Sequence, residues 1–184
     1  MIDFEKRIAL KTLNILKKKT LNNLKVDEVL KEFIKKKFKN KIKSKLDLLK
    51  NINRYVDDLL INQMKSLEQS SNKDMLFEVF MARFDILQKN RQSFISIYEG
   101  FKKSPQQLIK LLPSFLESMI ISAELAAFNV NGFKGTIRLK GLMIIYFATF
   151  FIWLDDSTTS LEKTMMALDK NLNHAEKFGN FYHE

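Results

Sequence analysis

The sequence predicts an all-α fold, and three observations support this. The 184 residues include only five glycines and two prolines, and the first ninety-nine residues contain neither. Sheet-rich folds need these turn residues more often. Apolar residues recur at helical spacing along most of the chain. The chain also has no cysteine, so a disulfide framework and a thiolate metal site are both excluded.

The N-terminal part is expected to form four helices. They are predicted at residues 3–18, 26–32, 33–42 and 44–67. In the third, Ile34, Phe38 and Ile42 share one face and lysines occupy the rest. The fourth begins at Ser44-x-x-Asp47, which resembles a capping box, a pattern in which two side chains bind each other's backbone N–H groups.

The remainder of the chain is expected to form five more helices, about nine in all. They are predicted at residues 71–88, 92–101, 104–128, 136–154 and 160–178. Asn131-Gly132 is expected to end the helix that starts at Ser104. The most hydrophobic stretch is 141–154. It falls short of the roughly 20 residues that cross a bilayer, so we expect a helix buried on all sides, either in a core or in a subunit interface.

The net charge of +10 is confined to one part of the chain. Residues 1–65 contain 18 Lys and Arg against 8 Asp and Glu, whereas residues 66–184 contain 13 of each. A lobe this basic suggests a polyanionic partner, either nucleic acid or an anionic membrane surface. A coding sequence rich in A and T would also favour lysine, but it does not account for the asymmetry.

A heptad pattern marks the last predicted helix. Leu161, Met165, Leu168, Leu172 and Ala175 are spaced 4, 3, 4 and 3 residues apart. Either this seam packs within the chain, or it pairs with a second copy to form a four-helix homodimer interface, which we favour. The expected interface residues are Tyr146, Phe150, Trp153, Leu161, Met165, Leu168 and Leu172.

Catalytic chemistry has little support in the sequence. Neither His174 nor His183 has a partner at metal-binding spacing, and no glycine-rich phosphate loop occurs. Asp155-Asp156 is more typical of a solvated turn than of acid–base catalysis. We therefore expect no enzyme activity, metal or cofactor. The N-terminus lacks the pattern of a secretory signal, so a cytoplasmic location is expected.

Aromatic residues of the later helices suggest an apolar ligand pocket, although the same residues would fill an ordinary core. The candidate pocket residues are Phe80, Phe84, Tyr98, Phe101, Phe115 and Phe128.

Several segments resemble a known family. Residues 74–85, and 153–156 together with 161–169, resemble segments common in TetR-like proteins of alphaproteobacteria. Ile42-Lys43-Ser44-Lys45-x-x-Leu48-Leu49 is similar to the Phe-Pro-Ser-Lys-x-x-Leu-Leu signature that opens helix four of TetR regulators.

The resemblance implies a homodimeric transcriptional regulator. Residues 1–50 would form a helix-turn-helix lobe that binds duplex DNA. Residues 51–184 would form the ligand-binding and dimerisation body, with an apolar small molecule or lipid as effector. Lys45 matches the family lysine that meets a phosphate. The implied DNA-binding residues are Lys35, Lys36, Lys37, Lys39, Asn40, Lys41, Ser44 and Lys45.

Departures from the family pattern favour a second hypothesis. Glu32-Phe33 replaces the usual glycine of the helix-turn-helix, and Lys25 replaces the usual Ser/Thr cap. Lysines bind phosphate but discriminate bases poorly, so we expect strong salt dependence and weak sequence preference. The alternative is a TetR-fold ubiquinone-biosynthesis accessory protein, which binds lipid and has lost operator recognition. Its basic helix would lie on an anionic membrane.

Overall fold

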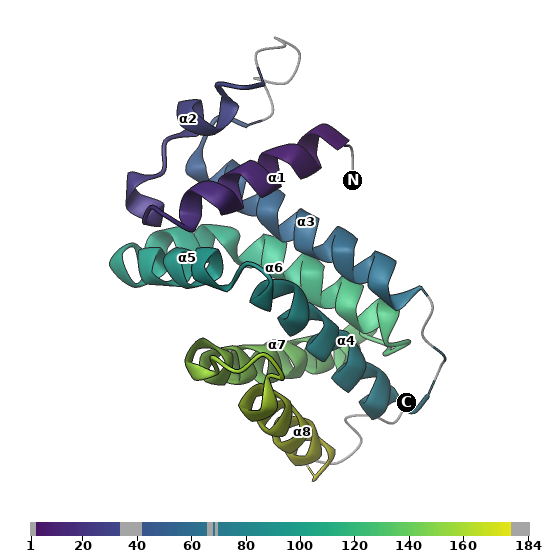
Figure 1. Ribbon diagram of the computed structural model, residues 1–184. Helices are drawn as coiled ribbons and strands as arrows, with labels where there is room; N and C mark the ends of the chain where they lie inside the picture. Colours follow the sequence, from purple (N-terminus) through teal and green to yellow (C-terminus); the bar gives the residue numbers. More distant parts are fainter. Residues whose placement is uncertain (1–2, 34–41, 66–67, 69, 178–184) are drawn as a thin grey trace. The chain divides into compact units, whose positions relative to one another are not determined.

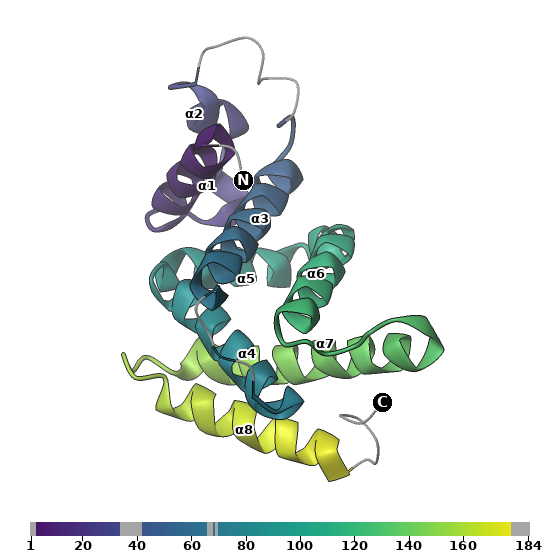
Figure 2. The same cartoon turned by 90° about the vertical axis from the view of Figure 1, so that its right-hand side faces the viewer.

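The computed structural model describes residues 3–33, 42–65, 68 and 70–177 (Figures 1 and 2). Within these residues the chain forms eight α-helices and one 3₁₀ turn, and no strand, so the predicted all-α class is confirmed. The elements are α1 (Asp3–Leu16), η1 (Leu21–Asn23), α2 (Val26–Leu30), α3 (Lys45–Met64), α4 (Asn72–Gln88), α5 (Arg91–Lys103), α6 (Pro105–Leu125), α7 (Gly132–Asp155) and α8 (Glu162–Lys177).

The chain divides into two compact units. Residues 1–58 and 89–115 form the N-terminal unit, and residues 59–88 and 116–184 form the C-terminal unit. The functional division at residue 50 stays a prediction. Of the nine predicted helices, the one at 33–42 falls mainly on residues 34–41, which lie outside the described part.

The N-terminal unit is held together by α5 packing on α1 and η1 (Figure 1). A Cβ added at Gly100 of α5 would lie only 2.6 Å from Leu21, so the absence of a side chain there permits this close approach. The hydroxyl of Ser93 also donates to the Leu13 carbonyl oxygen at 2.7 Å. Apolar side chains from α1, η1 and α2 are fully buried in this unit: Ile8, Leu13, Leu21, Leu24 and Val29.

The C-terminal unit is built on the α7–α8 hairpin, with α4 contacting both helices (Figure 2). Its centre is aromatic. Phe84 of α4 stacks on Tyr146 of α7, with ring centroids 5.3 Å apart. Trp153 is fully buried, and its indole N–H donates to the side-chain oxygen of Gln88 at 3.1 Å. The stacked rings and the hydrogen bond of the Trp153 indole N–H therefore fix α4 against the hairpin.

The end of α6 differs from the sequence prediction. The helix ends at Leu125 rather than continuing to Phe128, because Ala127 adopts a left-handed conformation with φ of 51°. The N–H of Phe128 donates back to the Ala123 carbonyl at 2.8 Å, which is a Schellman-type termination. Gly132, which was expected to end this helix, is the first residue of α7.

Within one chain, helix α7 is buried on one side only, so burial on all sides in a core is not seen, and burial in a subunit interface stays a prediction. Tyr146 and Trp153 face the core, whereas Ile144 and Phe151 on the same helix are largely exposed. Helix α7 is also the only helix in the described part whose length and composition would allow it to cross a membrane. Core helices of soluble proteins can meet the same criterion.

The turn between α7 and α8 is organised by Asp156, which is fully buried. Its carboxylate accepts hydrogen bonds from the N–H and hydroxyl groups of both Thr158 and Thr164, at 2.6–3.3 Å. Because Thr164 lies in the first turn of α8, the carboxylate caps that helix from the end of α7. Asp156 thus joins the two helices of the hairpin.

Removing this carboxylate should destabilise the protein. Asp156→Ala leaves the Thr164 N–H without its charged acceptor in a buried position, and we expect a loss of about 3 kcal/mol. The matched control is Asp155→Ala, an exposed neighbour, which should change stability by less than about 0.5 kcal/mol. Urea unfolding measures both. Equal effects of the two substitutions would contradict the capping role.

Acid should also weaken the turn. Burial alone would raise the pKa of the Asp156 carboxyl, but the hydrogen bonds from Thr158 and Thr164 outweigh it and lower this pKa from 3.8 to about 2. The resulting stabilisation, about 2 kcal/mol, is complete above the unfolded-state pKa and is lost as pH falls from about 3.8 to 2. The Asp156→Asn variant has no carboxyl group at this position. Its free energy of unfolding, measured against pH, should therefore lack this loss of stability in acid.

Candidate functional site

The start of α3 carries the two described members of the predicted DNA-binding set, Ser44 and Lys45. The capping box is confirmed: the Ser44 N–H donates to the Asp47 carboxylate at 2.9 Å, and the Asp47 N–H donates to the Ser44 hydroxyl oxygen at 3.2 Å. The N–H of Lys43 donates to the same carboxylate oxygen at 3.0 Å. The N–H groups of Lys43 and Ser44, just before the first residue of α3, are therefore already bound to an internal anion.

The charge of Asp47 is stabilised by these contacts. Burial alone would raise the pKa of its carboxyl, but the hydrogen bonds from Lys43 and Ser44 outweigh it and hold the pKa below its ordinary value. An external phosphate at the start of α3 would compete with a neighbouring carboxylate. Any phosphate contact here would depend on lysine ammonium groups more than on backbone amides.

The Lys45 side chain also has an internal partner. Its ammonium group donates to the Asn22 carbonyl oxygen of η1 at 2.6 Å. This bond joins the start of α3 to the turn before α2. A phosphate contact by Lys45 would require the ammonium group to share or exchange this acceptor.

Both ends of the lysine-rich segment 34–41 are anchored in the N-terminal unit. On one side, Phe33 makes an edge-to-face contact with Phe4, with centroids 5.3 Å apart, and the Arg7 guanidinium lies 5.6 Å from the Phe33 ring centre. On the other side, Ile42 is buried. The remaining predicted DNA-binding residues, which lie outside the described part, are Lys35, Lys36, Lys37, Lys39, Asn40 and Lys41.

The candidate pocket residues are divided between the two units. In the C-terminal unit, Phe80, Phe84 and Phe128 are buried, and both Phe80 and Phe84 contact the ring of Tyr146. These rings fill the core of the unit. The members of the set that belong to the N-terminal unit are Tyr98, Phe101 and Phe115, of which Phe101 is buried and the other two are half-buried.

The residues predicted for the dimer interface lie mainly inside the chain, which corrects their expected role. Tyr146 and Trp153 face α4, and the heptad leucines are fully buried because they pack in the hairpin core. Phe150 is half-buried, and Met165 is largely exposed. The fully buried heptad residues are Leu161, Leu168 and Leu172.

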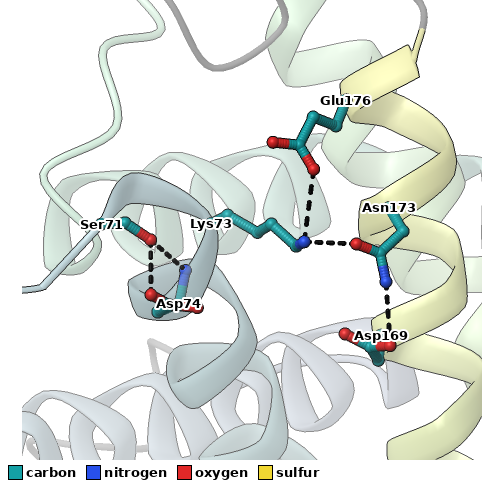
Figure 3. Close-up of polar contacts among 6 residues, drawn as sticks. All are labelled: Ser71, Lys73, Asp74, Asp169, Asn173 and Glu176. Atoms are coloured by element: carbon teal, nitrogen blue, oxygen red, sulfur yellow. Dashed lines mark hydrogen bonds and ion pairs between the residues drawn. The ribbon is translucent and has the colours of Figure 1, made fainter.

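A surface groove between α4 and α8 was not found from the sequence. It has a volume of about 380 Å³ and is lined by Lys73, Asp74, Phe77, Met165, Met166, Asp169 and Leu172. The Lys73 ammonium donates to the Asn173 side-chain oxygen and lies 3.3 Å from a Glu176 carboxylate oxygen (Figure 3). The Asn173 amide in turn donates to Asp169. No local pattern links Lys73 to residues one hundred positions later.

No known protein family and no curated protein matches the chain.

The Ser44 cap offers a stability test of the α3 start. Ser44→Ala removes the side-chain acceptor for the Asp47 N–H and should cost about 1 kcal/mol, whereas Ser44→Gly should cost only a few tenths. Thermal unfolding of the two variants gives the comparison. Unchanged stability of Ser44→Ala would show that this cap contributes nothing.

Proposed function

We propose that the protein is a TetR-like transcriptional regulator that binds duplex DNA through its lysine-rich N-terminal lobe. The observation that carries the proposal is the placement of charge. The whole excess of +10 lies in residues 1–65, and its densest stretch, 35–45, occupies the position of a recognition helix in the TetR-like order.

The local geometry supports this proposal. The segment 34–41 is bounded by Phe33, packed on α1, and by Ile42, which is buried. Glu28 of α2 pairs with Lys19, and Glu32, which follows α2, pairs with Lys11 of α1. Internal pairing of these carboxylates reduces their repulsion of a phosphate backbone nearby.

Binding through lysine makes salt dependence the main signature. Each phosphate neutralised releases counterions, so the logarithm of affinity falls linearly with the logarithm of salt concentration. Because the start of α3 already binds Asp47, the phosphate contacts are assigned mainly to lysine side chains. Sequence preference is expected to be weak, since lysine reads base edges poorly.

The proposal includes a homodimer and an apolar effector in the C-terminal body, both cytoplasmic. The effector's identity is not part of it. The alternative function is a lipid-binding accessory protein at an anionic membrane, and the exposed apolar face of α7 is the observation that favours it. The two functions differ in whether duplex DNA or a vesicle retains the protein.

Charge reversal in the basic segment should abolish DNA binding. We expect Lys36→Glu with Lys39→Glu to lower affinity for duplex DNA at least 100-fold in low salt and to reduce the slope of the salt dependence. The matched control is Lys163→Glu with Lys170→Glu, the same charge change at exposed positions of α8, which should alter affinity less than threefold. Fluorescence anisotropy with a labelled duplex measures both.

Unchanged binding in the first double variant would remove the DNA-binding assignment. Flotation of the wild type with anionic vesicles at low salt, together with no retention by duplex DNA, would establish the accessory-protein alternative instead.

A further inference from the structure

One face of α7 is apolar and uncovered. The most exposed large apolar residues of this helix are Phe133, Ile137, Ile144 and Phe151, with 83%, 56%, 70% and 51% of their surface accessible. Ile137, Ile144 and Phe151 are seven residues apart, and Phe133 precedes Ile137 by one turn. Spacing of seven and four places all of them along one side of the helix.

The opposite face of α7 is the one that its own chain covers. Tyr146 and Trp153 are buried against α4, and Leu142 and Thr149 are also fully buried. Helix α8 lies beside α7 in the hairpin (Figure 2), and Ile144 remains 70% exposed. The helix therefore has two apolar faces, of which one is buried within the chain and the other is exposed to solvent.

We propose that this second face, defined by Phe133, Ile137, Lys140, Ile144, Ala148 and Phe151, pairs antiparallel with the same face of a second copy, with Ile144 on the two-fold axis. The homodimer belongs to the proposed function, but this interface does not depend on DNA binding. The surface also differs from the heptad seam, whose leucines the chain buries internally.

The residue types are self-complementary in this register. Reversing α7 about position 144 brings Ile137 of one copy opposite Phe151 of the other, on both sides of the axis. Lys140 then lies opposite Ala148, and both are exposed. The small alanine leaves room for the apolar stem of the lysine, whose ammonium group can reach water at the rim. A C₂ interface requires this kind of reciprocal pairing.

Charge also favours the antiparallel arrangement. Lys134 lies in the first turn of α7 and Asp155 at its last residue, and both are exposed. Within one helix each charge lies at the unfavourable end of the helix dipole. In the antiparallel pair, Lys134 of each copy comes next to Asp155 and the carboxyl end of the other helix, so both charges gain a favourable neighbour.

The available area is close to what a stable dimer needs. Large apolar side chains have areas on the order of 150–250 Å², so the exposed fractions of these side chains amount to roughly 500 Å² per copy. Neighbouring residues such as Ile152 and the lysine stem add to this. A standard interface buries about 800 Å² per partner, and an exposed apolar patch of this size often has a functional role.

A second copy explains this face better than a bilayer does. Asp155 ends the face, and an exposed carboxylate is unfavourable at an anionic lipid surface. In the antiparallel pair the same carboxylate meets Lys134. The reciprocal fit of Lys140 with Ala148 likewise has a role in a two-fold pair.

The oligomeric state tests the proposal directly. The wild type should sediment as a dimer at about 10 µM, and Ile144→Asp should sediment as a monomer because it brings two carboxylates together on the axis. The matched control is Ile109→Asp, a similarly exposed isoleucine of α6, which should remain dimeric. The fluorescence of buried Trp153, the only tryptophan, reports whether each variant is folded.

Cross-linking tests the register, since the chain has no cysteine of its own. Ile144→Cys should form a disulfide dimer on mild oxidation, because a residue on the axis meets its own copy at disulfide distance. Ile137→Cys should cross-link to Phe151→Cys in a mixture, and each alone should react poorly. Ile109→Cys should not cross-link.

A monomeric wild type would overturn the proposal, as would a dimer that Ile144→Asp leaves intact. Flotation with anionic vesicles that Ile144→Asp abolishes in a monomeric protein would assign the face to a membrane instead. None of these results depends on DNA binding, so the interface and the proposed regulator function can fail separately.

Discussion

The burial of one face of α7 determines how the C-terminal unit is built. Tyr146 and Trp153 project from this helix into contact with α4, where Phe84 stacks on Tyr146 and Gln88 accepts the indole hydrogen bond. Helix α8 then covers a further part of the same helix through fully buried leucines. Each of these contacts uses α7, so its orientation fixes the places of α4 and α8.

The hydrogen bonds of Asp156 fix how the chain turns from α7 into α8. A buried carboxylate is unfavourable unless it is fully hydrogen-bonded, and Thr158 and Thr164 supply those bonds. Leu161, just before α8, is fully buried although its φ is 52°. A left-handed leucine is costly, so its burial and the Asp156 contacts together hold the chain in this reversal. Of the pair Asp155-Asp156, the buried Asp156 organises the turn, whereas Asp155 is exposed.

Local sequence patterns predicted where the helices lie, but they did not predict which surface each helix packs against. The capping box at Ser44 was readable because both members lie within one turn. The heptad of α8 correctly marked an apolar seam, but periodicity does not say whether α7 of the same chain or a second copy covers it. The exposed side of α7 was not predicted, for a related reason. A helix with apolar residues on all sides has the same sequence pattern whether one of its faces is covered or two. The Ala127 termination of α6 had no glycine to signal it.

Pairing of two copies through α7 would give the proposed regulator two lysine-rich segments for one DNA duplex. A helix-turn-helix dimer reads half-sites about one turn apart, roughly 34–36 Å. Spin labels at Lys43→Cys, an exposed residue beside the lysine-rich segment and outside the predicted DNA-binding set, measure this spacing between the two copies of the otherwise cysteine-free protein. We expect a dipolar coupling that corresponds to about 34–36 Å with duplex DNA bound, and its loss on adding Ile144→Asp. No coupling between copies in the presence of DNA, or a separation well outside one DNA turn, would contradict this arrangement.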